Sequence, residues 1–426
     1  MVLRQLNGRI LNRLTTALGF DVRFYGKSFI WFGFGQVSGV LRGIATTFLM
    51  ARWLPRSTMG EFRYILVVFS LAGMFAAGGV GAGIIRGIAK GDTIVVWAGI
   101  KRILMLAPLG SLLLLLAALE RWFVGESNIA AALVFSAVLF PAYAICGIYG
   151  SILTGQERIQ RLIKIAILNN TLFTICFFLV IWNTKELIPI FFAYLGIDVL
   201  FRGFLTWNEI RKLPKNGSAI EHVKLSDHLT AIGFVQAFAS QLDQILLQRF
   251  LGYDALANYS IATLIPEQIK DFVNAITGVM LRRFSKREEN NKTLAGTRKH
   301  FRTMLGLSAL LIIGYAIVAP LAIPRLFPQY GGVVLQSIVY SFGLLGLASI
   351  IGSNYFQAHH NLRALWKFFG ANAAIQITSN IILIPILGVW GAIWSKTITR
   401  LVGLPLSYPH ASTKKPSAPA SSTNTT

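Results

Sequence analysis

Four basic residues lie within or at the ends of long apolar stretches, where an ionisable side chain normally faces a cavity or a charged partner. Lys396 and Arg400 are four residues apart and therefore share one face of a helix. Arg42 and Arg86 lie in the N-terminal half of the chain. Guanidinium groups bind phosphate oxygens bidentately, and lysine adds a compact positive charge. We predict that these four residues form a cationic interior that binds an anionic substrate group.

A simpler interpretation of such cations is that they extend to the membrane interface or form ion pairs. Arg202 lies one helical turn from Asp198, so these two side chains are expected to pair. Arg400 is near the end of its apolar stretch, and its side chain is long enough to reach the interface. The sequence leaves both interpretations open.

Acidic residues form a second group of candidates. Glu267 and Asp271 are four residues apart, and two like charges side by side in a low dielectric resist ionising together. Lys270 or a shared proton would relieve them, and Pro266 weakens the helix at this point. With Asp243 these residues make a candidate site for gating or for coupling to H⁺ or Na⁺. The alternative is structural pairing with Lys270 and Asp243.

Two short sequences resemble nucleotide-binding loops without their context. Residues 25–28 end like a P-loop, but Asp21 stands where the first glycine is required and no strand precedes it. The glycines of residues 79–83 lie at a membrane helix, where small residues permit close packing. We therefore expect no bound cofactor and no metal, and active transport would depend on an ion or substrate gradient.

The composition places the surrounding elements in a membrane. The 426 residues are 54% hydrophobic and 13% charged, whereas soluble domains carry roughly 25% charged residues. The net charge of +23 could suggest a nucleic-acid partner, but the basic residues form short clusters between apolar runs. They are read as topology signals, and no nucleic-acid binding is expected.

Apolar segments of about 20 residues, enough to cross a bilayer, recur along the chain. The expected fold is an all-α polytopic membrane protein with twelve transmembrane helices. We place them at 28–51, 64–85, 103–119, 129–152, 163–182, 187–206, 228–250, 257–281, 303–323, 333–355, 365–386 and 390–407.

Basic residues concentrate in alternate loops, which predicts that those loops and both termini are cytoplasmic. An odd number of spans would invert every later loop, so the asymmetry favours an even number. The last residues are rich in Ser, Thr, Pro and Ala and are expected to be disordered.

An internal repeat divides the chain. Arg52-Trp53-Leu54 after the first span corresponds to Arg249-Phe250-Leu251 after the seventh. Two six-helix bundles that enter the membrane in the same sense are related by a pseudo-twofold axis along the membrane normal, as in alternating-access transporters. The predicted parts are a basic N-terminus (1–27), an N-terminal bundle (28–207), a cytoplasmic linker (208–227), a C-terminal bundle (228–408) and a cytoplasmic tail (409–426).

Several short motifs resemble those of Wzx-type polysaccharide flippases, a family of the multidrug/oligosaccharidyl-lipid/polysaccharide exporter superfamily. They occur in the family's order over nearly the whole chain. The motifs are Ala51-Arg52-Trp53-Leu54-Pro55 with Met59-Gly60-Glu61-Phe62, Gly155-Gln156-Glu157-Arg158, Asp243 with Leu251-Gly252 and Tyr259, and Asn380-Ile381-Ile382-Leu383-Ile384-Pro385 with Gly388-Val389-Trp390-Gly391-Ala392.

The resemblance implies a multi-pass protein of the bacterial cytoplasmic (inner) membrane. It would flip an undecaprenyl-pyrophosphate-linked oligosaccharide outward for surface polysaccharide biosynthesis, such as that of lipopolysaccharide. Its partners would be the lipid-linked oligosaccharide, membrane lipids and other membrane proteins of polysaccharide assembly. The family's cavity is cationic, in agreement with the charges above.

Two other functions remain as alternatives. An ion-coupled drug or small-molecule antiporter of the same superfamily would bind organic cations, which Arg42 and Lys396 would repel. A membrane glycosyltransferase or polymerase would need catalytic residues on sizeable outer loops, whereas the predicted outer loops are short. We therefore expect a transporter and not an enzyme.

Overall fold

The computed structural model describes residues 26–76, 79–214, 216, 220–284, 291–358 and 362–408. Helices account for nearly all of these residues, and no β-strand occurs among them. The predicted tail and most of the basic N-terminus lie outside the described residues. The all-α membrane fold predicted from the sequence is confirmed.

The N-terminal lobe consists of the helices that precede residue 211. These are α2 (Gly26–Trp53), α3 (Arg56–Ala72), η1 (Gly73–Ala76), α4 (Val80–Ala89), α5 (Val95–Phe123), α6 (Ser127–Cys146), α7 (Ile148–Gly155), α8 (Ile159–Asn183) and α9 (Leu187–Ile210).

The C-terminal lobe follows after the predicted linker, which includes the end of α9 and the start of α10. Its elements are α10 (Ile220–Phe284), α11 (Asn291–Leu326), η2 (Pro328–Val333), α12 (Val334–Ser341), η3 (Phe342–Leu347), α13 (Ala348–Ala358), α14 (Leu362–Leu387) and α15 (Val389–Ser407).

These elements correspond to the twelve predicted spans. Helix α10 has 65 residues, roughly 100 Å of helix and too long for one crossing. It breaks at Gly252, whose φ of 81° and ψ of −172° suit glycine, and so supplies both the seventh and the eighth span. The second, fourth and tenth spans are each built from consecutive shorter helices.

Among the described residues, eight helical segments are long and apolar enough to cross a membrane by length and composition alone. Helix α15 is not among them, because Lys396 and Arg400 lower its hydropathy. Helix α5 presents leucines such as Leu112 and Leu116 on its exposed surface, as expected of a face in contact with lipid.

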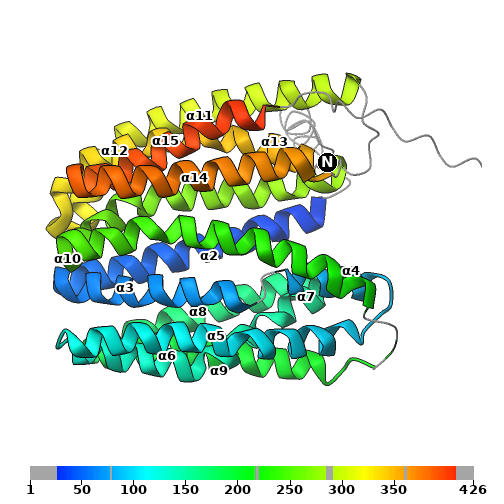
Figure 1. The fold of residues 1–426 in the computed structure, drawn as a ribbon, viewed down its shortest axis with the longest axis horizontal. Coiled ribbons are helices and arrows are strands. Elements are labelled where there is room, and N and C mark those ends of the chain that lie inside the picture. Colours follow the sequence, from blue (N-terminus) through cyan, green and yellow to red (C-terminus); the bar gives the residue numbers. More distant parts are fainter. Residues whose placement is uncertain are drawn as a thin grey trace, which may run out of the picture.

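Figure 1 shows the helices running side by side in two groups, with α5, α6 and α9 on one side and α11, α14 and α15 on the other. Helices α2 and α10 lie between them. Helix α10 packs against α3 of the N-terminal lobe and against α14 of its own lobe. The boundary between the lobes is therefore formed mainly by α2, α3 and α10, and polar residues on these helices can face each other across it.

Candidate functional site

A cavity of about 1100 Å³ lies between the two lobes. Helices α2, α3, α8 and α9 contribute its N-terminal wall, and α10, α12 and α15 contribute its C-terminal wall. The lining includes Arg42, Asp198, Glu267, Lys270 and Lys396. The structure thus brings residues from both ends of the sequence to one site, which we call the central cavity.

Charged residues of the N-terminal lobe converge on Asp198, a buried residue of α9. Arg42 Nη2 lies 3.0 Å from Asp198 Oδ1, and Arg202 Nε lies 3.1 Å from Asp198 Oδ2. The Arg42 guanidinium also donates to Asn170 Oδ1 at 3.4 Å and lies 3.6 Å from the centre of the Phe173 ring. Asp198 and Arg202 pair as their spacing predicted, and Arg42 joins them from another helix.

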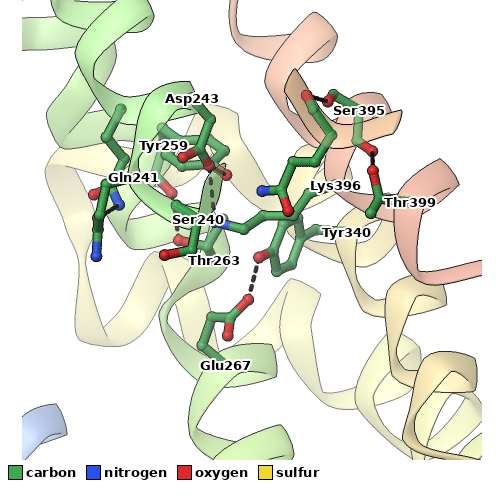
Figure 2. Close-up of polar contacts among 12 residues, drawn as sticks. Ser240, Gln241, Asp243, Tyr259, Thr263, Glu267, Tyr340, Ser395, Lys396 and Thr399 are labelled. Carbon is green, nitrogen blue, oxygen red and sulfur yellow. Dashed lines mark hydrogen bonds and ion pairs between the residues drawn. The ribbon is translucent and has the colours of Figure 1, made fainter. Parts of the chain in front are cut away.

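Lys396 of α15 pairs with Asp243 of α10 in the C-terminal lobe. Figure 2 shows the ammonium reaching across to the carboxylate, with Nζ 2.8 Å from Asp243 Oδ2 and 3.4 Å from the Ser240 carbonyl oxygen. The Tyr259 hydroxyl donates to the same Oδ2. Asp243 is fully buried, so Lys396 supplies the positive charge that offsets this carboxylate inside the lobe.

Glu267 is the centre of a second cluster in this lobe. Arg400 and Lys270 form ion pairs with its carboxylate. The Tyr340 hydroxyl also donates to this carboxylate, as Figure 2 shows. Lys270 Nζ also lies 3.8 Å from Asp271 Oδ1. Lys270 therefore relieves the two like charges of Glu267 and Asp271, one of the arrangements that their spacing left open.

Arg63 is a cavity residue that the sequence did not reveal, because the predicted second span begins at residue 64 and leaves Arg63 in an outer loop. Its Nε donates to Gln244 Oε1 at 2.8 Å, and no carboxylate pairs with it among the described residues. Arg63 and Ser70 are seven residues apart on α3 and both line the cavity. Polar residues two helical turns apart in an apolar segment indicate a polar helix face, and this spacing could have identified the cavity-facing side of α3.

The neutral contacts of Arg63 extend across the lobe boundary. Gln244 Nε2 donates to Gln241 Oε1 at 2.8 Å, and Gln241 Nε2 donates to Ser70 Oγ at 3.1 Å. The chain of hydrogen bonds begins and ends on α3 and passes through α10. It holds the two lobes together without neutralising the Arg63 charge.

The charges around the site are unequal in number. Six basic side chains meet four acidic ones, which leaves two positive charges in excess. The basic residues are Arg42, Arg63, Arg202, Lys270, Lys396 and Arg400, and the acidic ones are Asp198, Asp243, Glu267 and Asp271. An anionic group is therefore the charge type that the site favours.

Two of the predicted anion-binding residues lie elsewhere than expected. Arg86 is exposed in the last turn of α4 and does not belong to the described lining of the central cavity. The predicted span of residues 64–85 ends directly before Arg86, and the structure leaves this side chain at the protein surface. Arg400 lines a neighbouring cavity within the C-terminal lobe.

The lobes meet tightly at one end of the cavity. A Cβ atom on Gly60 of α3 would lie 2.0 Å from the Tyr253 carbonyl oxygen, beside the break at Gly252. The Tyr253 hydroxyl donates to Glu126, which lies in the turn between α5 and α6, and Arg121 Nη1 is 3.2 Å from the same carboxylate. Burial and the bond to Glu126 raise the pKa of Tyr253, so its hydroxyl remains a donor.

The chain matches a known family and a known fold. The family model described as polysaccharide biosynthesis protein matches residues 25–288. No curated protein sequence matches the chain significantly.

Solved structures share the fold at low sequence identity. One, described as lipid II flippase MurJ in an inward closed conformation, superposes with a TM-score of 0.71 at 15% identity, covering 89% of this chain and 86% of that chain. Another is a multidrug resistance MATE family transporter of the MOP superfamily in its inward-facing conformation, with a TM-score of 0.64 at 14% identity, covering 86% and 92%. These likenesses show that the chain has the same two-lobed fold.

Proposed function

Because the chain belongs to the polysaccharide biosynthesis protein family, we propose that this multi-pass membrane protein flips a lipid-linked oligosaccharide across the bacterial inner membrane. The cargo is an oligosaccharide joined to undecaprenyl through a diphosphate. The observation that carries the proposal is the central cavity, which both lobes line and in which basic residues outnumber acidic ones. A diphosphate is the part of the cargo that such a cavity would bind.

The direction of transport follows from the predicted topology. With both termini cytoplasmic, the turns at Gly60, Glu126 and Tyr253 lie on the outer side, where the lobes are in contact. The cavity would then load from the cytoplasmic side. The lipid tail stays in the bilayer, the lobes rock, and the head group leaves outward to membrane proteins that assemble the polymer.

The charge balance supports this cargo over the alternatives. An antiporter of organic cations needs a cavity with acidic residues free to bind them, but Asp243 and Glu267 are already paired with Lys396, Arg400 and Lys270. The same pairing argues against a glycosyltransferase, which needs an acid or base free to exchange a proton with its substrate.

Coupling to H⁺ or Na⁺ is a second part of the proposal. A diphosphate that attracts Lys396 and Arg400 competes with Asp243 and Glu267 for the same cations. A carboxylate that loses its counterion in a low dielectric must take up a proton or another cation. Cargo binding and cation uptake would therefore be linked. For Glu267→Gln, we expect transport to lose part of its dependence on pH or on the Na⁺ gradient.

The test of the function is a flipping assay in proteoliposomes that contain the lipid-linked oligosaccharide. The wild-type protein is expected to move the head group to the opposite leaflet, and cells without the protein should accumulate the lipid-linked units on the cytoplasmic side. Organic-cation export without any head-group movement would contradict the proposal. A tag at Thr426 that is reached from the periplasm would contradict the topology.

A further inference from the structure

A second cavity of about 530 Å³ lies within the C-terminal lobe. Its described walls come from α10, η3, α13, α14 and α15, all of the C-terminal lobe. Ala237, Ser240 and Lys270 line both this cavity and the central one. The two spaces therefore lie next to each other, and we call the second one the lobe pocket.

Four side chains of the lobe pocket carry buried polar atoms that have no hydrogen-bond partner among the described residues. They are Arg400 Nη1, Gln376 Nε2, Asn372 Oδ1 and Ser349 Oγ. Buried polar groups are nearly always satisfied, and each one left without a partner is costly. Four in one pocket indicate a space built for a polar occupant.

The contacts of Asn372 and Arg400 fix which atoms remain free. Asn372 Nδ2 donates to the Phe368 carbonyl oxygen at 2.9 Å, so the free atom is the acceptor Oδ1. Arg400 uses Nη2 for Glu267 and retains Nη1 as a free donor. A Cβ on Gly403 would lie 3.1 Å from Asn372 Oδ1, so glycine keeps this wall open.

The free atoms include both donors and acceptors. Arg400 and Gln376 offer N–H groups, Asn372 offers only an oxygen, and Ser349 can do either. A phosphate oxygen only accepts and would leave Asn372 Oδ1 without a donor. Sugar hydroxyls both donate and accept, so several of them on one glycan can together satisfy all four atoms.

The remaining lining suits the rings of a sugar. Phe368 and Phe369 supply apolar aromatic surface, on which the C–H faces of a sugar can pack. The volume falls within the range of about 300–1,000 Å³ that is usual for ligand pockets.

We propose that the lobe pocket binds the first sugars of the cargo while the diphosphate stays in the central cavity. The inference rests on the proposed function, because it assumes a glycan attached to the group in the central cavity. It makes Asn372, Gln376 and Ser349 residues that recognise the glycan. The protein would thereby distinguish a lipid that carries its oligosaccharide from a bare polyprenyl diphosphate.

The experiment compares two ligands of the purified full-length protein in nanodiscs. The first is the polyprenyl-diphosphate oligosaccharide fraction extracted from cells that lack the protein, and the second is bare polyprenyl diphosphate of the same length. We expect the wild type to bind the glycosylated lipid roughly tenfold more tightly, the effect of one or two buried hydrogen bonds. Asn372→Leu/Gln376→Leu should lose this preference and keep its affinity for the bare lipid.

The controls separate the possible failures. Ser349→Val removes a hydroxyl from another wall and should reduce the same preference. Asn183→Leu repeats the Asn372→Leu change at an exposed residue outside the pocket and should leave the preference intact. Unchanged binding of the bare lipid shows that a variant is folded. Equal binding of both ligands by the wild type, or an undiminished preference in both pocket variants, would mean that the pocket holds only water. If the wild type bound neither ligand, the proposed function itself would be wrong.

Discussion

The Lys396 ammonium lies 2.8 Å from Oδ2 of Asp243, although 153 positions separate the two residues in the chain. The sequence assigned Lys396 to anion binding and Asp243 to ion coupling, as separate sites. Their contact makes them one unit, in which any anion that attracts the lysine also changes the charge environment of the aspartate. The following predictions test this pair and the cations around it.

Removing Lys396 alone should destabilise the protein. Lys396→Met leaves the fully buried Asp243 carboxylate without its counterion, which typically costs about 3–5 kcal/mol of unfolding free energy. The double variant Asp243→Asn/Lys396→Met removes both charges and should recover most of this loss. Thermal unfolding in detergent measures both effects. A single variant as stable as the wild type would show that the pair does not hold the lobe together.

Arg63 should contribute more to cargo affinity than to stability. It pairs with no carboxylate among the described residues, so Arg63→Gln does not leave a buried carboxylate without its counterion. A lost charge-assisted hydrogen bond costs about 1.5–3 kcal/mol, and we expect affinity for bare polyprenyl diphosphate to fall roughly 10- to 100-fold. Melting temperature and binding by titration should be measured on the same preparation. Unchanged affinity would remove Arg63 from the anion site.

Arg42→Ala should abolish surface polysaccharide while the protein still inserts in the membrane. Asp198 keeps Arg202 at 3.1 Å, so the substitution does not leave this carboxylate unpaired. Arg86→Ala is the matched control, because this arginine is exposed outside the described cavity lining. Polymer on the cell surface and lipid-linked units inside the cell are the two quantities to measure. Normal polymer with Arg42→Ala would contradict the role of the cavity.

Gly60→Ala should separate the lobes at their closed end. Its Cβ would fall 2.0 Å from the Tyr253 carbonyl oxygen, a distance that atoms cannot adopt, so one of the two backbones must move. A cysteine introduced at Gln241, in the cavity lining, should then react faster with an impermeant maleimide added from outside. Gly73→Ala is the control, since its Cβ would meet no atom within 4 Å. Equal labelling of both variants would place the outer closure elsewhere.

The sequence by itself determined the membrane fold and the division into two lobes. Each apolar segment is buried in lipid independently of the others, and each basic loop favours the cytoplasmic side independently. Composition and loop charge are therefore enough to predict the spans and their orientation. For the same reason the charged residues inside spans could be recognised one by one. The pairing of Asp198 with Arg202 was also predictable, because both lie on one helix.

Only the tertiary structure decided how these charges are used. Arg42 meets Asp198 and Lys396 meets Asp243 across different helices, and no local pattern encodes which helix faces which. The tertiary structure also left Arg86 at the surface, outside the described cavity lining, and placed Arg63 in that lining. An ion pair or a pocket depends on distances between distant segments, and these distances exist only once the lobes have packed together.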